Sequence, residues 1–215
     1  GSEMCIRDRY TKENSSYSKL INFGVSQTKG EYILQLSNTS KIITDDWIEK
    51  TLGYAQREDV GAVASKIFDE NDNILYAGII VGGKEGKIYL NQGLNNKKYG
   101  YFAKECHIQN FSCVALNTMI CKRNDFEKAG GLDEKLIGYE DVDFCLKLRE
   151  KGLLNVYMPY SKVYDSNIEN YKIKNKDIVI ELKEKWKNIY EKGDMYYNPN
   201  LSLEKNRYNI RKEKI

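Results

Sequence analysis

The chain has 215 residues, of which 41% are hydrophobic, and its 34 basic and 31 acidic side chains give a net charge of +3. This length and composition suffice for one domain with a sizeable core. No apolar run approaches the roughly 18 residues that a membrane span needs. So small a net charge does not favour nucleic acid as a partner.

Cysteine and histidine usage narrows the chemistry further. The five cysteines are an odd number without a Cys-x-x-Cys pair, and His107 is the single histidine, so the sequence supplies no zinc ligand set. This usage favours a cytoplasmic protein. Cys113, Cys121 and Cys145 lie in apolar runs and are expected in the core.

The chain divides into three predicted parts. Residues 1–9 lack the apolar segment of a signal peptide, and we interpret them as a non-native leader. We expect one domain over residues 10–168, then a carboxyl-terminal helix and basic tail over residues 169–215. A solvated, frayed terminus is typical of such a tail, and attachment to a membrane surface is the alternative. The basic residues of the tail are Lys205, Arg207, Arg211, Lys212 and Lys214.

Apolar spacing predicts helices that alternate with strands. In chain order we expect a helix at 18–28, a strand at 31–36, a helix after Thr44, strands at 60–68, 74–81 and 87–90, an apolar strand-like segment at 111–121, a short helix ending at Gly130, a helix that begins near Glu140, and a final helix at 178–190. This alternation predicts an α/β fold with a mainly parallel sheet flanked by helices. Ligands then bind at the carboxyl ends of the strands.

Three acids mark the start of the helix near residue 140. Glu140, Asp141 and Asp143 stand where a glycine-containing loop runs into an amphipathic segment. Acids in a first helical turn complement the helix dipole, which is a purely structural explanation. A catalytic or binding site is the other explanation, because the acids lie at a loop end rather than along a solvated helix face.

The segment from Ala129 to Arg149 resembles the Gly-Gly-Phe-Asp-Glu … Asp-Val-Asp-Leu-Cys-Leu-Arg motif of family 2 glycosyltransferases. Other short blocks follow in that family's order, and the resemblance covers about residues 10–205. The blocks are 17–24, 29–34, 44–48, 59–63, 109–110, 158–160 and 194–201. So many matches in one order are hard to obtain by chance. The resemblance implies a nucleotide-sugar-binding α/β domain, of which this chain holds the carboxyl part and lacks the amino-terminal part.

The resemblance also implies the chemistry. In that family a carboxylate removes the proton from an acceptor hydroxyl, whose oxygen attacks the anomeric carbon from the face opposite the leaving diphosphate. The matching base is Asp141, and Glu140 beside it would bind the acceptor. Asp143 is expected to support the start of the helix.

On the donor side, the resemblance implies a divalent ion, Mg²⁺ or Mn²⁺, on the diphosphate. Relatives carry acids after the strand that ends near Leu36, but this sequence has Ser37, Asn38 and Thr39 there. These three residues are the expected donor-binding positions. The family's second metal ligand, a histidine, is matched by Asp165, which is either a metal ligand or an ordinary turn residue. Because Thr39 replaces an acid, the sequence predicts a weakened metal site.

Two functions follow from these observations. The first is an inverting transfer of a sugar from a nucleotide-diphosphate donor to a saccharide acceptor in surface polysaccharide synthesis, with the chain inactive on its own because its domain is incomplete. The second is a degenerate, non-catalytic relative that binds saccharide or a partner transferase. A nucleic-acid-binding module is not favoured, because only the basic tail suggests it. The expected location is the cytoplasm, and contact with the inner face of the membrane is an additional expectation.

Overall fold

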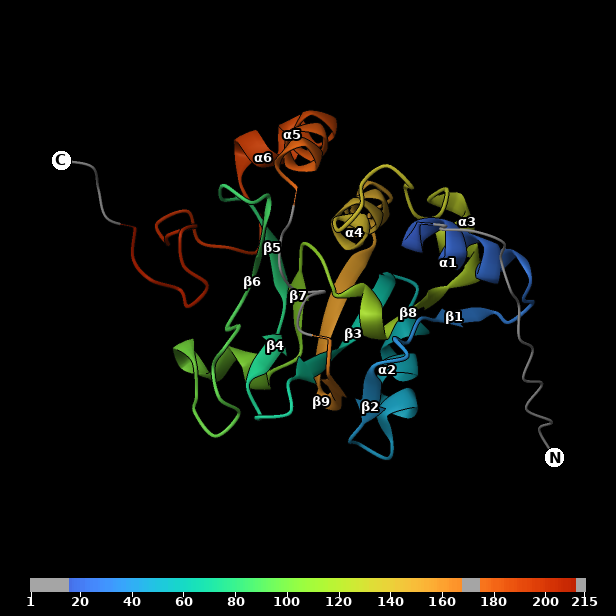
Figure 1. Ribbon diagram of the computed structural model, residues 1–215, viewed down its shortest axis with the longest axis horizontal. Coiled ribbons are helices and arrows are strands. Elements are labelled where there is room, and N and C mark those ends of the chain that lie inside the picture. Colours follow the sequence, from blue (N-terminus) through green and yellow to red (C-terminus); the bar gives the residue numbers. More distant parts are fainter. Residues whose placement is uncertain (1–15, 168–174, 212–215) are drawn as a thin grey trace.

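The computed structural model describes residues 16–167 and 175–211. Within them a mixed sheet has the strand order β1-β8-β3-β9-β2, while β4 pairs with β3 and β7 pairs with β9 (Figure 1). The strands of this sheet are β1 Tyr32–Leu34, β2 Ser40–Ile42, β3 Val60–Phe68, β4 Ile74–Tyr76, β7 Gln109–Phe111, β8 Met119–Lys122 and β9 Leu154–Asp165. A separate hairpin pairs β5 Ile79–Val81 with β6 Lys87–Tyr89.

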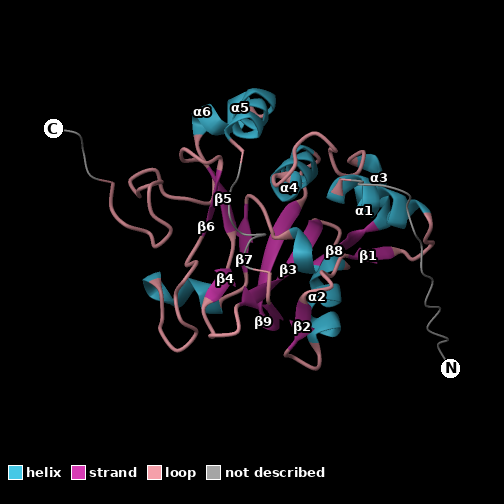
Figure 2. Ribbon diagram, in the orientation of Figure 1, coloured by secondary structure: helices cyan, strands magenta, loops and turns pink. Residues whose placement is uncertain are grey.

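Helices surround these strands (Figure 2). They are α1 Tyr17–Ser26, α2 Trp47–Ala55, α3 Arg123–Lys128, α4 Glu140–Glu150, α5 Lys176–Lys185 and α6 Lys187–Lys192, with short 3₁₀ helices η1 Tyr101–Cys106 and η2 Leu116–Thr118. No described helix combines the length and the apolar character that crossing a membrane requires.

The α/β class predicted from the sequence is confirmed, but the sheet is mixed rather than mainly parallel. Among the described strands, only β3 and β9 pair in parallel, and β8 runs antiparallel to both of its neighbours, β1 and β3. Helix α4 lies on the crossover that brings the chain back to β9. Alternation of helices and strands does not reveal this difference, because mixed sheets produce the same alternation.

Strand β3 lies at the centre of the core, and all nine of its residues are buried. Its side chains alternate between two faces, as in any strand. Ala62 and Ala64 belong to the larger apolar cluster, which contains the buried face of α4, whereas Val63 packs in the smaller cluster with Ala55 of α2. The three cysteines expected in the core, Cys113, Cys121 and Cys145, are buried there.

The apolar run over residues 74–81 forms two strands rather than the single predicted one. Gly78 separates them with φ +109°, a conformation that side-chain-bearing residues rarely adopt. A Cβ atom at this position would lie 2.3 Å from the ring of Phe111. This close approach lets the chain leave the main sheet after β4 and enter the β5–β6 hairpin.

The predicted carboxyl-terminal helix packs on the domain but is broken in two at Trp186. Val179, Leu182 and Trp186 are buried in the main core, and Ile178 and Ile189 are half-buried against it. The Trp186 indole N–H donates to Asp143 Oδ1 at 3.0 Å, and Trp186 has φ −107° and ψ 28°, outside regular helical geometry.

The basic tail is folded as far as Arg211, so the frayed terminus expected from the sequence is wrong for this part. Tyr208 is buried, Leu201 and Ile210 form a β-bridge, and the carbonyl of Asn206 accepts from the Asn91 N–H at 2.8 Å. Lys212, Lys214 and the predicted leader at residues 1–9 lie outside the described residues.

Candidate active site at the start of helix α4

Helix α4 begins with buried charge. Glu140 and Asp141 are each 7% exposed, and Asp143 is fully buried. The loop before them turns at Gly138 (φ +85°), whose N–H donates to Glu140 Oε2 at 2.7 Å. Acids that only complement a helix dipole remain solvated, so burial requires that this charge be balanced from elsewhere.

Asp141 is balanced by Lys87, which reaches it from β6. Lys87 Nζ lies 2.8 Å from each carboxylate oxygen of Asp141 and also donates to the carbonyl of Gly138 at 2.8 Å. The rings of Tyr89 and Tyr139 lie 5.1 Å from the ammonium group. Burial is the largest effect and lowers the pKa of Lys87, but Asp141 and Tyr89 together outweigh it and raise the pKa of Lys87 above its usual value. Sequence patterns do not point to this partner, because 54 residues separate Lys87 from Asp141.

Asp143 has a different role from Asp141. Its Oδ1 accepts from Trp186 and lies 2.7 Å from Lys185 Nζ, and its Oδ2 lies 2.7 Å from Lys147 Nζ. Asp143 therefore fixes α5 and α6 to α4, which extends the role in helix support expected from the sequence.

Glu140 is the least compensated of the three acids. Burial raises the pKa of its carboxyl, and the charge of Asp141 raises it further, while the N–H of Gly138 and the charge of Lys87 oppose the rise. The raised pKa means that the surroundings of Glu140 destabilise the ionised form of its carboxyl. Such a group is a functional-site candidate, because a purely structural role does not require it.

The expected donor-binding residues form a turn after β1. Asn38 is exposed, whereas Ser37 and Thr39 are half-buried and their hydroxyl oxygens are 2.7 Å apart. Thr39 Oγ1 donates to Asp165 Oδ1 at 2.6 Å, and Asn117 Nδ2 donates to Asp165 Oδ2 at 3.0 Å. The structure thus brings Ser37, Thr39 and Asp165 together.

These donor-side residues do not fit a divalent cation. Asp165 is fully buried, and its Oδ1 accepts from both Thr39 and the N–H of Asn167. Among the described residues, no three or more histidine, cysteine or acidic side chains gather into a possible metal site. Mg²⁺ at a phosphate substrate is held by one or two carboxylates together with phosphate oxygens and waters, and here both oxygens of the one carboxylate already accept hydrogen bonds from Thr39, Asn117 and Asn167. The geometry favours Asp165 as a residue that fixes the turn.

Tyr17, at the first position of α1, lies near both groups of residues. Tyr17 is 40% exposed as a whole residue, yet the partial burial of its side chain, followed by the charges of Glu140, Asp141 and Asp165, raises the pKa of its hydroxyl to about 12. The hydroxyl also bonds to the side-chain amide of Gln35. The acceptor-side acids and the donor-side Asp165 thus act electrostatically on one hydroxyl, a link that sequence spacing does not reveal.

We expect Lys87→Met to lower the free energy of unfolding by about 3–5 kcal/mol, because it leaves Asp141 buried without its cation. Adding Asp141→Leu should restore most of this loss. Urea denaturation measures both variants. Arg57→Met breaks the exposed pair with Asp59 and is the matched control, for which little change is expected. A loss in Lys87→Met as small as that control's would contradict the buried pair.

We expect Glu140→Gln to be more stable than the parent at pH 7. A raised pKa means that the folded protein holds this proton more tightly than the unfolded chain, so stability is lost as pH rises from the usual glutamate value through the raised pKa. The gap between variant and parent should therefore close as pH falls to about 4.3, the usual glutamate pKa. Thermal unfolding across this range, with the exposed Glu150→Gln as control, measures the gap. Lower stability of Glu140→Gln at pH 7 would show that the Gly138 hydrogen bond outweighs burial.

Comparison with known proteins gives two relatives in sequence; no protein-family model matches the chain. The uncharacterised protein y4gI of Sinorhizobium fredii is 30% identical over 218 residues, which cover 96% of this chain and 24% of that protein. The O-antigen biosynthesis protein RfbC of Myxococcus xanthus is 28% identical over 200 residues, covering 87% of this chain and 15% of that protein. The chain thus spans about a quarter or less of the length of these curated relatives.

Among solved structures, the crystal structure of GalNAc-T7 with UDP, GalNAc and Mn²⁺ is similar to this chain. The TM-score is 0.60 at 13% sequence identity, and the match covers 81% of this chain and 35% of that one. At this identity the likeness shows the fold. The predicted resemblance is confirmed at this level: the chain has the fold of a glycosyltransferase and is related in sequence to a protein of O-antigen biosynthesis.

Proposed function

We propose that this chain provides an inverting sugar transfer from a nucleotide-diphosphate donor to a saccharide acceptor, in the synthesis of a surface polysaccharide. The observation that carries the proposal is the buried, oriented carboxylate of Asp141 at the start of α4. Two comparisons support it: one relative is named for O-antigen biosynthesis, and the structural neighbour was crystallised with UDP and GalNAc.

In this proposal Asp141 is the general base. Its carboxylate takes the proton of an acceptor hydroxyl as that oxygen attacks the anomeric carbon of the donor sugar. Lys87 holds both carboxylate oxygens in one direction, which fixes the geometry before the acceptor binds. Glu140 orients the acceptor by hydrogen bonding to its hydroxyl groups, and this role accounts for a buried acid that weakens the fold.

On the donor side, Ser37, Asn38 and Thr39 are proposed to contact the nucleotide sugar. The family's Mg²⁺ or Mn²⁺ is not part of the proposal, because the residues here do not fit such an ion. The positive charge nearest in sequence is Lys41, an exposed residue of β2. The proposed location is the cytoplasm at the inner face of the membrane, and the free cysteines are compatible with a reducing compartment.

Asp141→Asn tests the base, in a form of the protein that shows turnover, because the chain is expected to be inactive on its own. The substitution keeps the shape of the side chain but removes the carboxylate, so we expect turnover to fall roughly 10²- to 10⁴-fold. Transfer and donor hydrolysis are measured by chromatography with UDP-, GDP- and dTDP-sugars. Asp177→Asn is the matched control, because Asp177 also lies in the first turn of a helix, α5, but is exposed. Unchanged turnover in Asp141→Asn would show that Asp141 is not the base and only stabilises the start of the helix.

A degenerate, non-catalytic relative that binds saccharide or a partner transferase is the second candidate. The hydrogen bond from Thr39 to Asp165 favours this second candidate. The hydroxyl and the carboxylate bond to each other at the positions where glycosyltransferases of family 2 bind a metal ion. Absent turnover does not separate this candidate from the first, because the chain is expected to be inactive on its own under both; the response of a Thr39 variant to Mn²⁺ does.

Thr39→Asp separates the two candidates. The new carboxylate would lie beside that of Asp165, so we expect repulsion to lower the melting temperature and Mn²⁺ to restore it. The neutral Thr39→Asn is the control and should not respond to Mn²⁺. Donor hydrolysis that rises with Mn²⁺ in Thr39→Asp, and not in the parent, identifies a decayed transferase. A melting temperature that rises equally with Mn²⁺ in the parent would contradict the poor metal fit.

A further inference from the structure

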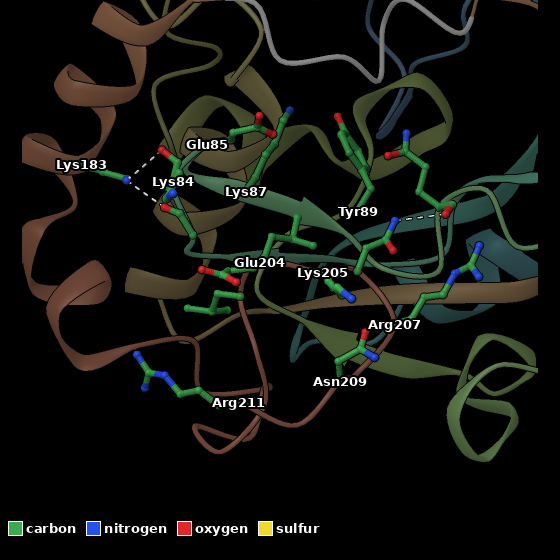
Figure 3. A pocket seen from close by; sticks show the side chains of 15 residues that line it. Lys84, Glu85, Lys87, Tyr89, Lys183, Glu204, Lys205, Arg207, Asn209 and Arg211 are labelled. Carbon is green, nitrogen blue, oxygen red and sulfur yellow. Dashed lines mark hydrogen bonds between the residues drawn. The ribbon is translucent and has the colours of Figure 1, made fainter. Parts of the chain in front are cut away.

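A groove lies between the β5–β6 hairpin and the carboxyl-terminal segment, and the proposed active site does not use it. Its volume is about 1410 Å³ (Figure 3). Ile88 and Leu203 form an apolar part of its wall, both close to the backbone of Gly83. Ligand pockets for small molecules measure roughly 300–1,000 Å³, so this groove has room for an oligomer.

The groove and Asp141 lie on opposite faces of β6. Lys87 and Tyr89 are buried, with Lys87 directed at Asp141, whereas Ile88 between them is half-buried and faces the groove. In Figure 3 the side chains of Lys87 and Tyr89 lie on the other side of the strand from those of Glu204 and Lys205. The groove is therefore a second surface, on the face of β6 opposite to Asp141.

Positive charge dominates the groove. Among the described residues, six of its lining side chains are basic and two, Glu85 and Glu204, are acidic. Lys87 is neutralised by Asp141, and Lys183 donates to the carbonyls of Gly83 and Lys84. Four cations remain for a ligand: Lys84, Lys205, Arg207 and Arg211. They exceed the two acids, whereas the whole chain is nearly neutral in proportion to its size.

The remaining lining groups suit sugar hydroxyls. Gln92, Asn206 and Asn209 bring amide side chains to the same walls. Amides both donate and accept hydrogen bonds, as hydroxyl groups do. The planar guanidinium of an arginine such as Arg207 matches a carboxylate or phosphate with two parallel bonds.

We propose that this groove binds an anionic glycan, a saccharide chain that carries carboxylates or phosphates. That this glycan is the growing acceptor chain rests on the proposed sugar transfer, whereas the binding of an anionic glycan does not depend on it. Single-stranded nucleic acid fits less well, since it needs rings to stack on, and Tyr89, the one aromatic side chain among the described residues of the lining, is buried beneath Lys87. A bilayer fits less well because a lipid surface does not enter a concave groove.

The test measures binding by calorimetry with the whole chain and no donor. The probes are hexagalacturonate, the neutral maltohexaose of equal length, a twelve-residue oligothymidylate, and vesicles of phosphatidylcholine with phosphatidylglycerol. Arg207→Gln/Arg211→Gln is the groove variant. Lys19→Gln/Lys128→Gln removes the same charge from α1 and α3, at the opposite end of the molecule from the carboxyl-terminal segment (Figure 1). Circular dichroism shows that both variants fold.

We expect hexagalacturonate to bind the parent and maltohexaose to bind much more weakly. The dissociation constant should rise roughly tenfold in the groove variant and stay unchanged in the control. Absent binding, or an equal loss in both variants, overturns the proposal. Equal or tighter binding of oligothymidylate or vesicles overturns it in favour of nucleic acid or lipid. Because no donor is present, these outcomes are independent of the Asp141→Asn result.

Discussion

The start of α4 depends on the neutralisation of buried carboxylates by lysines, two of which come from other parts of the chain. Removing a carboxylate from water is costly unless a cation replaces the lost hydration. Lys87 does this for Asp141, and Lys185, with Lys147, does it for Asp143. The first turn of one helix thereby fixes the β5–β6 hairpin on one side and the carboxyl-terminal helices on the other. The geometry of the proposed base is a result of this arrangement.

The two sides of the proposed site use different physics. On the acceptor side, full charges are buried and paired. On the donor side, Thr39, Asn117 and Asp165 form a hydrogen-bonded set around a single buried carboxylate. That set stabilises the approach of β2 and β9, where Ser40 pairs with Asp165. Asp165, which matches a metal ligand of family 2 glycosyltransferases, thus contributes here to strand pairing.

The sequence predicted most of what local patterns determine. The helix at 18–28, strand β3, the start of α4 and the apolar stripe of the last helix follow from periodicity and helix-start residues. Pairing direction, the break at Trp186 and the folding of the basic tail were not predictable, because each depends on a distant contact. The same reason hid Lys87: a lysine in a short strand is ordinarily solvated, and only the tertiary fold places Asp141 against it.

Because the side chains of β6 face Asp141 on one side and the groove on the other, the length of the turn before β6 is constrained. Side chains of a strand alternate, so a slip of one residue exchanges its faces. Here the register is fixed by bonds from Gly82 N to Gly86 O and from Leu90 N to Gly78 O, each 3.0 Å long. One residue inserted between Gly82 and Gly86 would turn Ile88 towards Asp141 and leave a carboxylate buried against a hydrocarbon. Among homologues, this hairpin should therefore accept substitutions but not insertions or deletions of a single residue.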